Sequence, residues 1–95
     1  MLTAIVLVEA ERSAIAGLGP ALSDVSGVAE AYSATGEFYF VAILRVKDHE
    51  EIAEIVTTRL SQIKGILKTR THVAFKVYSK HDLEAMFSVG LQEAR

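Results

Sequence analysis

The side chains that could perform acid–base or metal chemistry are scattered along this chain rather than grouped. The histidines are His49, His72 and His81. They fall on a predicted helix start, a strand and a C-terminal segment, without the i, i+4 spacing of a zinc-binding helix. The acid pairs Glu9/Glu11 and Glu50/Glu51 flank predicted helices, where water and the helix dipole stabilise carboxylates. We therefore predict no catalytic residues, no metal site and no cofactor.

Nucleophilic and phosphate-binding motifs are also missing from the sequence. No serine stands in a G-x-S-x-G elbow, and no glycine belongs to a G-x-G-x-x-G run or a P-loop. The chain has no cysteine, which excludes disulfides, thiolate catalysis and cysteine-ligated metals. These absences favour a binding or assembly protein over an enzyme.

One polar cluster could bind a small molecule. Gly36, Glu37 and Tyr39 precede or begin the predicted third strand, and Thr69 and Thr71 share one face of the fourth. A glycine lets a ligand approach the backbone, and threonine hydroxyls both donate and accept hydrogen bonds. The cluster could hold a zwitterion. The alternative is that the glycine serves only a hairpin and that the threonines are ordinary strand formers.

Composition sets the class of protein. The chain has 95 residues, of which 51% are hydrophobic and 23% are charged, and its net charge is −2. The length predicts a single domain with apolar surface left for a partner. The charge lacks the basic footprint of a nucleic-acid-binding protein. No apolar run approaches the ~18 residues of a membrane span, and the opening TAIVLV lacks the flanks of a signal peptide. We expect a cytoplasmic protein.

The first half of the chain predicts one strand, one helix and a hairpin. Residues Leu2–Val8 are β-branched or aliphatic, as in a strand buried on both faces. A helix is predicted over Arg12–Ser23, where Pro20 should cause a kink, an early stop or a division into two short pieces. Strands are predicted over Val28–Ala34 and Phe38–Val46, joined at Thr35-Gly36-Glu37.

The second half predicts a helix, a strand and a tail helix. Asp48 and Glu51 form a capping-box-like pair, and Gly65 should end the helix that they begin. A strand is predicted over Ile66–Val77. Ser79 and Asp82 resemble the cap of a last helix, which carries four apolar residues on one side: Leu83, Met86, Phe87 and Leu91.

The order β-α-β-β-α-β predicts an α+β fold, the ferredoxin-like sandwich with four antiparallel strands, two helices on one face and a C-terminal helix. Strands one and three are then central, so the third strand does not adjoin the fourth within one chain, and a pocket that uses both Gly36 and Thr69 is easier to build between subunits. The third strand is apolar on both faces, and only one face can lie under the helices. A second subunit, packed sheet against sheet as in a dimeric α/β barrel, is the simplest cover for the other.

Two runs, AYSATGEFYFVAILRVKDHEEI and IKGILKTRTHVAF, resemble the ligand-binding domain of the Lrp/AsnC transcriptional regulators, called the RAM domain. The resemblance covers residues 2–78. Matching positions are Tyr32, Ser33, Thr35, Gly36, Val46, Lys47, Asp48, Gly65, Thr69 and Thr71. It implies a homodimer that assembles into tetramers or octamers and holds amino-acid effectors between dimers. The implied ligand-binding residues are Gly36, Glu37, Phe38, Tyr39, Thr69 and Thr71.

Two departures from the family pattern shape these expectations. The chain has no room for a helix-turn-helix domain before Leu2, so we predict a stand-alone domain over residues 1–95 that acts through a full-length regulator. Tyr39 stands where the family has an aspartate, and Phe38 replaces a tyrosine. An effector's ammonium group would then use Glu37 or backbone carbonyls, or Tyr39 would fill the ligand space and leave a purely structural role. A monooxygenase-like α/β-barrel enzyme and an ACT-like sensor would share the same fold and stay open as functions.

Overall fold

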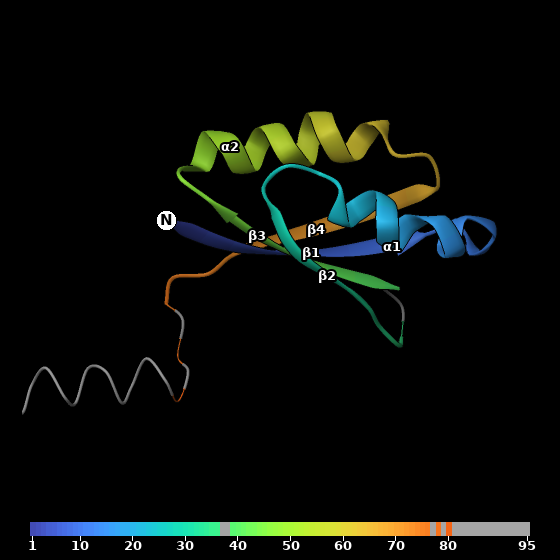
Figure 1. Cartoon of the computed structure of the whole chain (residues 1–95), viewed down its shortest axis with the longest axis horizontal. Helices are drawn as coiled ribbons and strands as arrows, with labels where there is room; N and C mark the ends of the chain where they lie inside the picture. Colours follow the sequence, from blue (N-terminus) through green and yellow to red (C-terminus); the bar gives the residue numbers. More distant parts are fainter. Residues whose placement is uncertain (37–38, 77, 79, 81–95) are drawn as a thin grey trace, which may run out of the picture.

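The computed structural model describes residues 1–36, 39–76, 78 and 80. Four strands form one antiparallel sheet in the order β2-β3-β1-β4 (Figure 1). They are β1 (Leu2–Ala10), β2 (Val28–Ser33), β3 (Phe40–Val46) and β4 (Ile66–Val73). Strands β1 and β3 are central, as predicted. Among the described residues, no helix is long and apolar enough to cross a membrane.

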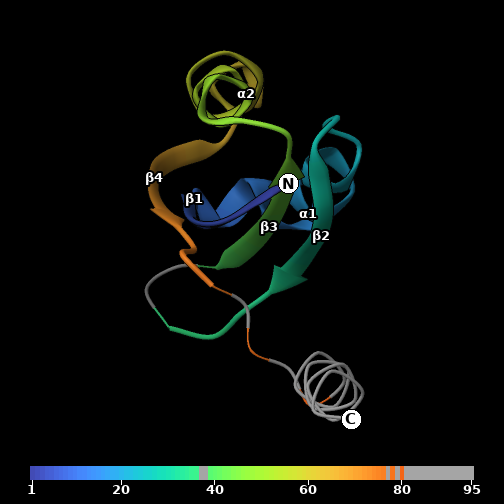
Figure 2. The ribbon, with the colours of Figure 1, turned by 90° about the vertical axis from the view of Figure 1, so that its left-hand side faces the viewer.

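Two helical segments lie on the same side of the sheet (Figure 2). The first comprises a 3₁₀ turn, η1 (Arg12–Ala14), and the helix α1 (Ile15–Ser23). The second comprises α2 (His49–Glu54), a π-helical turn η2 (Ile55–Arg59) and a 3₁₀ turn η3 (Leu60–Gln62). With the sheet they form the predicted ferredoxin-like α+β fold.

A single core lies between the sheet and the two helical segments. Alternate residues of each central strand face it because successive side chains in a strand point to opposite faces. The buried residues are Ala4, Val6, Val8, Ala10, Leu18, Leu22, Phe40, Ala42, Leu44, Val46, Ile52, Ile55 and Leu60. Leu18 and Leu22 of the first helical segment and Ile52, Ile55 and Leu60 of the second therefore face the core. No helical segment of the described part of the chain covers the opposite side of the sheet.

Several predicted boundaries were wrong. Strand β3 begins at Phe40 rather than Phe38, because the amide of Ala34 donates to the carbonyl of Tyr39 at 2.7 Å and closes a longer loop. Strand β4 ends at Val73 rather than Val77. The amide of Ala74 still donates to Thr3, but β1 begins at Leu2 and leaves no partner beyond it.

The helices also differ from the prediction. No early stop occurs at Pro20, since α1 continues to Ser23; the break into two pieces falls instead at the junction of η1 and α1. The cap at Asp48 is confirmed, because its Oδ1 accepts from the amide of Glu51 at 2.9 Å. The Glu51 carboxylate reaches back to the amide of Lys47, at 3.4 Å, rather than to that of Asp48. The predicted tail helix, with Leu83, Met86, Phe87 and Leu91, lies outside the described residues.

Candidate functional site

Half of the predicted ligand site lies in the loop between β2 and β3. Gly36 has a φ of +98° and is exposed, and a Cβ built on it would meet nothing within 4 Å. Tyr39 is half-buried and packs against the core beside the start of β3. Glu37 and Phe38, the other predicted residues of this loop, lie outside the described residues. The loop therefore offers exposed backbone at Gly36, while the Tyr39 side chain packs against the core.

The other half of the predicted site lies on β4. Thr69 pairs with Val8 and Thr71 with Val6, and both valines point into the core. The two threonines therefore lie on the side of the sheet that carries the helices. Thr69 is half-buried, whereas Thr71 is exposed.

The two halves lie at the same end of the sheet but do not meet. Val8 of β1 pairs with Phe40 on one side and with Thr69 on the other. The start of β3 and Thr69 are therefore separated by two strand spacings, about 10 Å. This agrees with the expectation that β1 divides them within one chain. A pocket completed by a second subunit stays a prediction.

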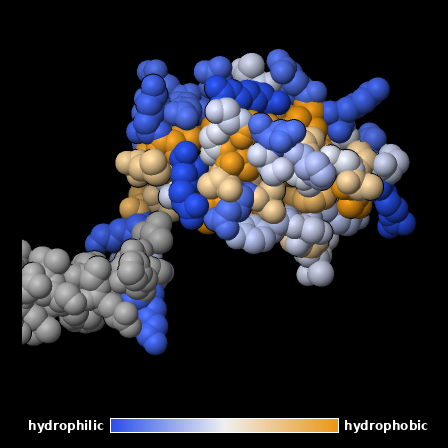
Figure 3. Space-filling view, viewed as in Figure 1, coloured by the Kyte–Doolittle hydropathy of each residue, from blue (hydrophilic) through white to orange (hydrophobic). Residues whose placement is uncertain are grey.

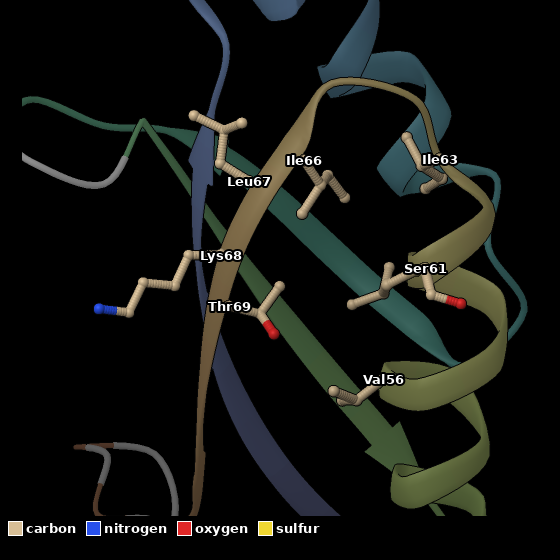
Figure 4. Close-up of a pocket in the computed structure, with 8 residues that line it drawn as sticks. Val56, Ser61, Ile63, Ile66, Leu67, Lys68 and Thr69 are labelled. Carbon is tan, nitrogen blue, oxygen red and sulfur yellow. The ribbon is translucent and has the colours of Figure 1, made fainter.

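A cleft of about 190 Å³ opens between the second helical segment and β4 (Figure 4). Val56 and Ile63 point into it from the helical side, and Ile66 and Thr69 point into it from the strand. The residues that line it are Val56, Leu60, Ser61, Ile63, Ile66, Leu67, Lys68 and Thr69. Thr69 belongs to the predicted site. Val56 and Ile63 are partly buried against the core, and the sequence pattern did not predict the cleft.

The π-helical turn shapes one wall of this cleft. The amide of Leu60 donates to the carbonyl of Ile55, five residues earlier, so both side chains point into the core. The hydroxyl of Ser61 lies 2.8 Å from the carbonyl oxygen of Thr57 and 2.9 Å from that of Thr58, in position to donate to either. Such π turns occur often at functional sites. The spacing of five between Ile55 and Leu60 is the one sequence signal that could have revealed it.

The uncovered side of the sheet is apolar at its centre and polar at one edge. Ile5 of β1 is 36% exposed, and its pairing partner Ile43 is half-buried. At the edge, the Arg45 guanidinium lies 3.4 Å from the Glu30 carboxylate, and the Tyr32 hydroxyl donates to the same carboxylate. This hydrogen bond, together with the negative charge of Glu30, raises the pKa of Tyr32. The arrangement resembles an interface, with an apolar centre inside a polar rim.

No metal-binding cluster is found among the described residues. No three acidic, histidine or cysteine side chains there gather closely enough to hold an ion. His49 begins α2 and His72 lies on β4, while His81 falls outside the described residues. The fold defines a small α+β domain of the ferredoxin-like class.

The comparisons with known proteins identify the family. The family model for the Lrp/AsnC ligand binding domain matches residues 3–83, so this chain belongs to that family. The structure of TTHA0845 from Thermus thermophilus is 38% identical, with a TM-score of 0.78. That match covers 84% of this chain and all of the other. No curated protein sequence matches this chain.

Two larger regulators share the fold. The structure of Escherichia coli AsnC is 14% identical, with a TM-score of 0.75 over 82% of this chain and 53% of AsnC. The transcriptional regulator NMB0573 of Neisseria meningitidis, solved with L-Met, is 16% identical, with a TM-score of 0.73 over 82% of this chain and 52% of the other. This chain thus spans about half the length of each. Both are regulators, and at these identities they establish the fold alone.

Proposed function

We propose that this chain is an effector-binding and oligomerisation domain that takes an amino acid or a similar small molecule and acts on transcription through a full-length Lrp/AsnC regulator. The observation that carries the proposal is the placement of the Gly36 loop and the Thr69–Thr71 stretch at one end of the sheet, within a domain of this family. The complex of NMB0573 with L-Met supports the choice of an amino acid.

The effector would bind where two dimers meet. One chain presents backbone and the Glu37 carboxylate from the β2–β3 loop, and another presents the hydroxyls of β4. A site shared in this way overcomes the separation that β1 imposes within a single chain. It would also couple effector binding to assembly, because a ligand that binds only the assembled form stabilises that form.

The dimer itself would form through the uncovered side of the sheet. The centre of that side carries Ile5, Leu7, Val41 and Ile43, all of which are half-buried or exposed within one chain. A second copy of the same sheet would remove these side chains from water. We propose further that such dimers assemble into a tetramer or an octamer. We also propose that the protein is cytoplasmic.

An enzyme of the α/β-barrel type fits the described residues less well. Such an enzyme needs a polar cavity between helices and sheet. Here the core-facing residues of the central strands are apolar, and Val6, Val8 and Leu44 have no exposed surface at all. The described residues therefore favour binding over catalysis.

A thermal-shift screen with the twenty amino acids tests the proposal. A ligand at about one hundred times its Kd stabilises the folded state by about 2.7 kcal/mol. For a domain of this size that raises the Tm by roughly 10–20 °C, at roughly 4–8 °C per kcal/mol. Calorimetry on the best ligand would follow. Failure of all twenty to raise the Tm would remove the effector from the proposal and favour a purely structural role.

A further inference from the structure

The uncovered side of the sheet carries different charges at its two edges. At the β4 edge, the residues on this side are basic and exposed: Lys68, Arg70 and His72. Strand β4 contains no acidic residue. At the β2 edge, the residues on this side are Glu30 and Tyr32, and β2 contains no basic residue. The uncovered side therefore has a basic edge and an acidic edge.

Strand pairing aligns these residues in two rows that cross the whole sheet. In order from β4 to β2, the rows are His72, Ile5, Ile43, Glu30 and Arg70, Leu7, Val41, Tyr32. Each row is apolar in the middle and polar at its ends, which lie three strand spacings, about 14 Å, apart. The outer surface over α2 is different, since hydrophilic side chains gather along the upper edge of the molecule there (Figure 3).

Two aligned sheets that face each other across a twofold axis can be arranged in two ways. The axis lies between the sheets and runs either across the strands or along them. An axis across the strands places β4 of one copy over β4 of the other. An axis along the strands places β4 over β2, because the sheet has the order β2-β3-β1-β4. It also leaves every residue at its own height, so that each row lies over the same row of the other copy in reverse order.

We propose that the dimer has its twofold axis along the strands, so that the basic edge β4 of each copy covers the acidic edge β2 of its partner. This inference rests on the proposed sheet-to-sheet dimer and specifies which residues meet in it. His72 then lies over the partner's Glu30. Arg70 lies over the partner's Tyr32, whose ring can accept a guanidinium on its face.

The charges disfavour the other arrangement. With the axis across the strands, the three basic side chains of β4 would lie against the same three side chains of the second copy. Like charges that face each other across an interface select against that partner or orientation. With the axis along the strands, the apolar centres of the rows still cover one another, and each basic edge meets an edge that contains a carboxylate.

Glu30 is already positioned for a contact across the interface. Its carboxylate lies 3.4 Å from the Arg45 guanidinium and accepts a hydrogen bond from Tyr32, yet 42% of the side chain is exposed. A carboxylate has about four acceptor sites, so these two neighbours leave room for a donor from a partner. The contacts within the chain thus fix the carboxylate at the rim and keep it available.

Charge reversal tests the orientation. Glu30→Lys should raise the dimer dissociation constant by at least about tenfold, and adding Arg70→Glu in the same chain should restore most of the loss. The two residues lie at opposite edges of one sheet, about 14 Å apart, so a rescue requires contact between copies. Sedimentation over a dilution series measures both constants. Effects of the two substitutions that simply add would overturn the proposed orientation.

The matched control is Glu54→Lys. Glu54 also lies beside an arginine of its own chain, with 3.9 Å between its carboxylate and the Arg59 guanidinium, but it is on the helical layer. Its reversal should leave the dimer dissociation constant unchanged. This comparison separates a contact between copies from the loss of an ion pair within one chain.

Cross-linking gives a second test, because the chain has no cysteine of its own. The double variant Tyr32→Cys/Arg70→Cys should form a covalent dimer with a short bismaleimide, whose flexible spacer tolerates the rotation of about 30° between aligned sheets. Neither single variant should do so, since like positions of the two copies would be three strand spacings apart. A covalent dimer of Arg70→Cys alone would place β4 over β4 and overturn the inference.

A third substitution distinguishes a wrong orientation from a wrong interface. Adding Ile43→Asp to the double-cysteine variant should abolish the cross-link, because it breaks the proposed dimer. If no variant cross-links, the orientation is wrong, and light scattering on Ile43→Asp shows what else fails. A reduced mass would leave the dimer with another arrangement, whereas an unchanged mass would refute the sheet-to-sheet dimer as well.

Discussion

At the scale of single residues, the structure separates the roles of neighbouring polar groups. Gly36 presents an open backbone and Tyr39 packs against the core, although the two belong to one loop. Thr69 lies inside a cleft and Thr71 lies outside it, although they share one side of β4. A ligand that used this region would therefore depend on the loop and on the threonines to different degrees.

We predict that Glu37→Gln weakens amino-acid binding by about 1–3 kcal/mol, because a charge-assisted hydrogen bond to the ammonium group is lost. Thr71→Val should weaken binding less, since it removes a neutral hydroxyl. Titration calorimetry on both variants measures the difference. Identical affinities in the two variants and the parent chain would place the ligand elsewhere.

We predict that Glu30→Gln lowers the pKa of Tyr32 toward its ordinary value. The Glu30 carboxylate accepts a hydrogen bond from the Tyr32 hydroxyl and its charge disfavours the phenolate, which is why the pKa of Tyr32 is raised. A raised folded-state pKa contributes stability that is present below the unfolded-state pKa and lost as the pH rises through the folded-state value. NMR titration of the Tyr32 ring in the variant and in the parent chain would report the change. An unchanged titration would show that Glu30 does not control it.

At the scale of elements, close backbone approaches fix how the helical segments meet the strands. Gly65 has a φ of +98°, and a Cβ there would overlap the Cβ of Ala14, while the Gly65 carbonyl accepts from the amide of Glu11 at 2.8 Å. The turn before β4 is thereby held against η1. Gly36 has the same φ but faces open space. Substitutions at Gly36 and Gly65 can therefore be compared to separate the cost of the strained backbone from the cost of the overlap with Ala14.

We predict that Gly65→Ala destabilises the fold more than Gly36→Ala does. Both variants pay the cost of a positive φ, about 1–2 kcal/mol. Only Gly65→Ala adds an overlap with Ala14, which overpacking data value at about 1–3 kcal/mol. Denaturant unfolding of the two variants gives the comparison. Equal losses of unfolding free energy would mean that Ala14 can move away from a Cβ at position 65 at no energetic cost.

At the scale of the whole molecule, the helical segments cover most of one side of the sheet, and no helical segment of the described residues covers the other. The helical side encloses the core, whereas the opposite side leaves Ile5 and Ile43 accessible on paired central strands. A rim with the Glu30–Arg45 ion pair borders this apolar centre. That division is what a sheet-to-sheet dimer needs.

We predict that Ile43→Asp breaks the dimer, because burying an unpaired carboxylate at the centre of an apolar interface costs several kcal/mol. Light scattering should then give a mass that falls from that of the parent assembly toward the single-chain mass of 10.3 kDa. Thr57→Asp, on the exposed part of η2, is the matched control and should leave assembly intact. Dimers that survive Ile43→Asp would show that the interface lies on another surface.

The sequence by itself determined the order of the elements, the fold class and the family, because these follow from local patterns. Runs of β-branched and aliphatic residues predicted the central strands, and Asp48 with Glu51 predicted the start of α2. The runs around Gly36 and Thr69 carried the family resemblance. The separation of these two stretches by a central strand also followed from the fold class.

Only the tertiary structure decided the features that depend on distant partners. The end of β4 at Val73 follows from where β1 begins, and local strand propensity cannot report that. The π turn that places Ile55 and Leu60 on one side is a response to packing, and the cleft beside it exists only once α2 and β4 are brought together. The exposure of Thr71 and Val73 on the core-facing side of β4 likewise reflects how far the helical layer extends over the sheet, which no local pattern encodes.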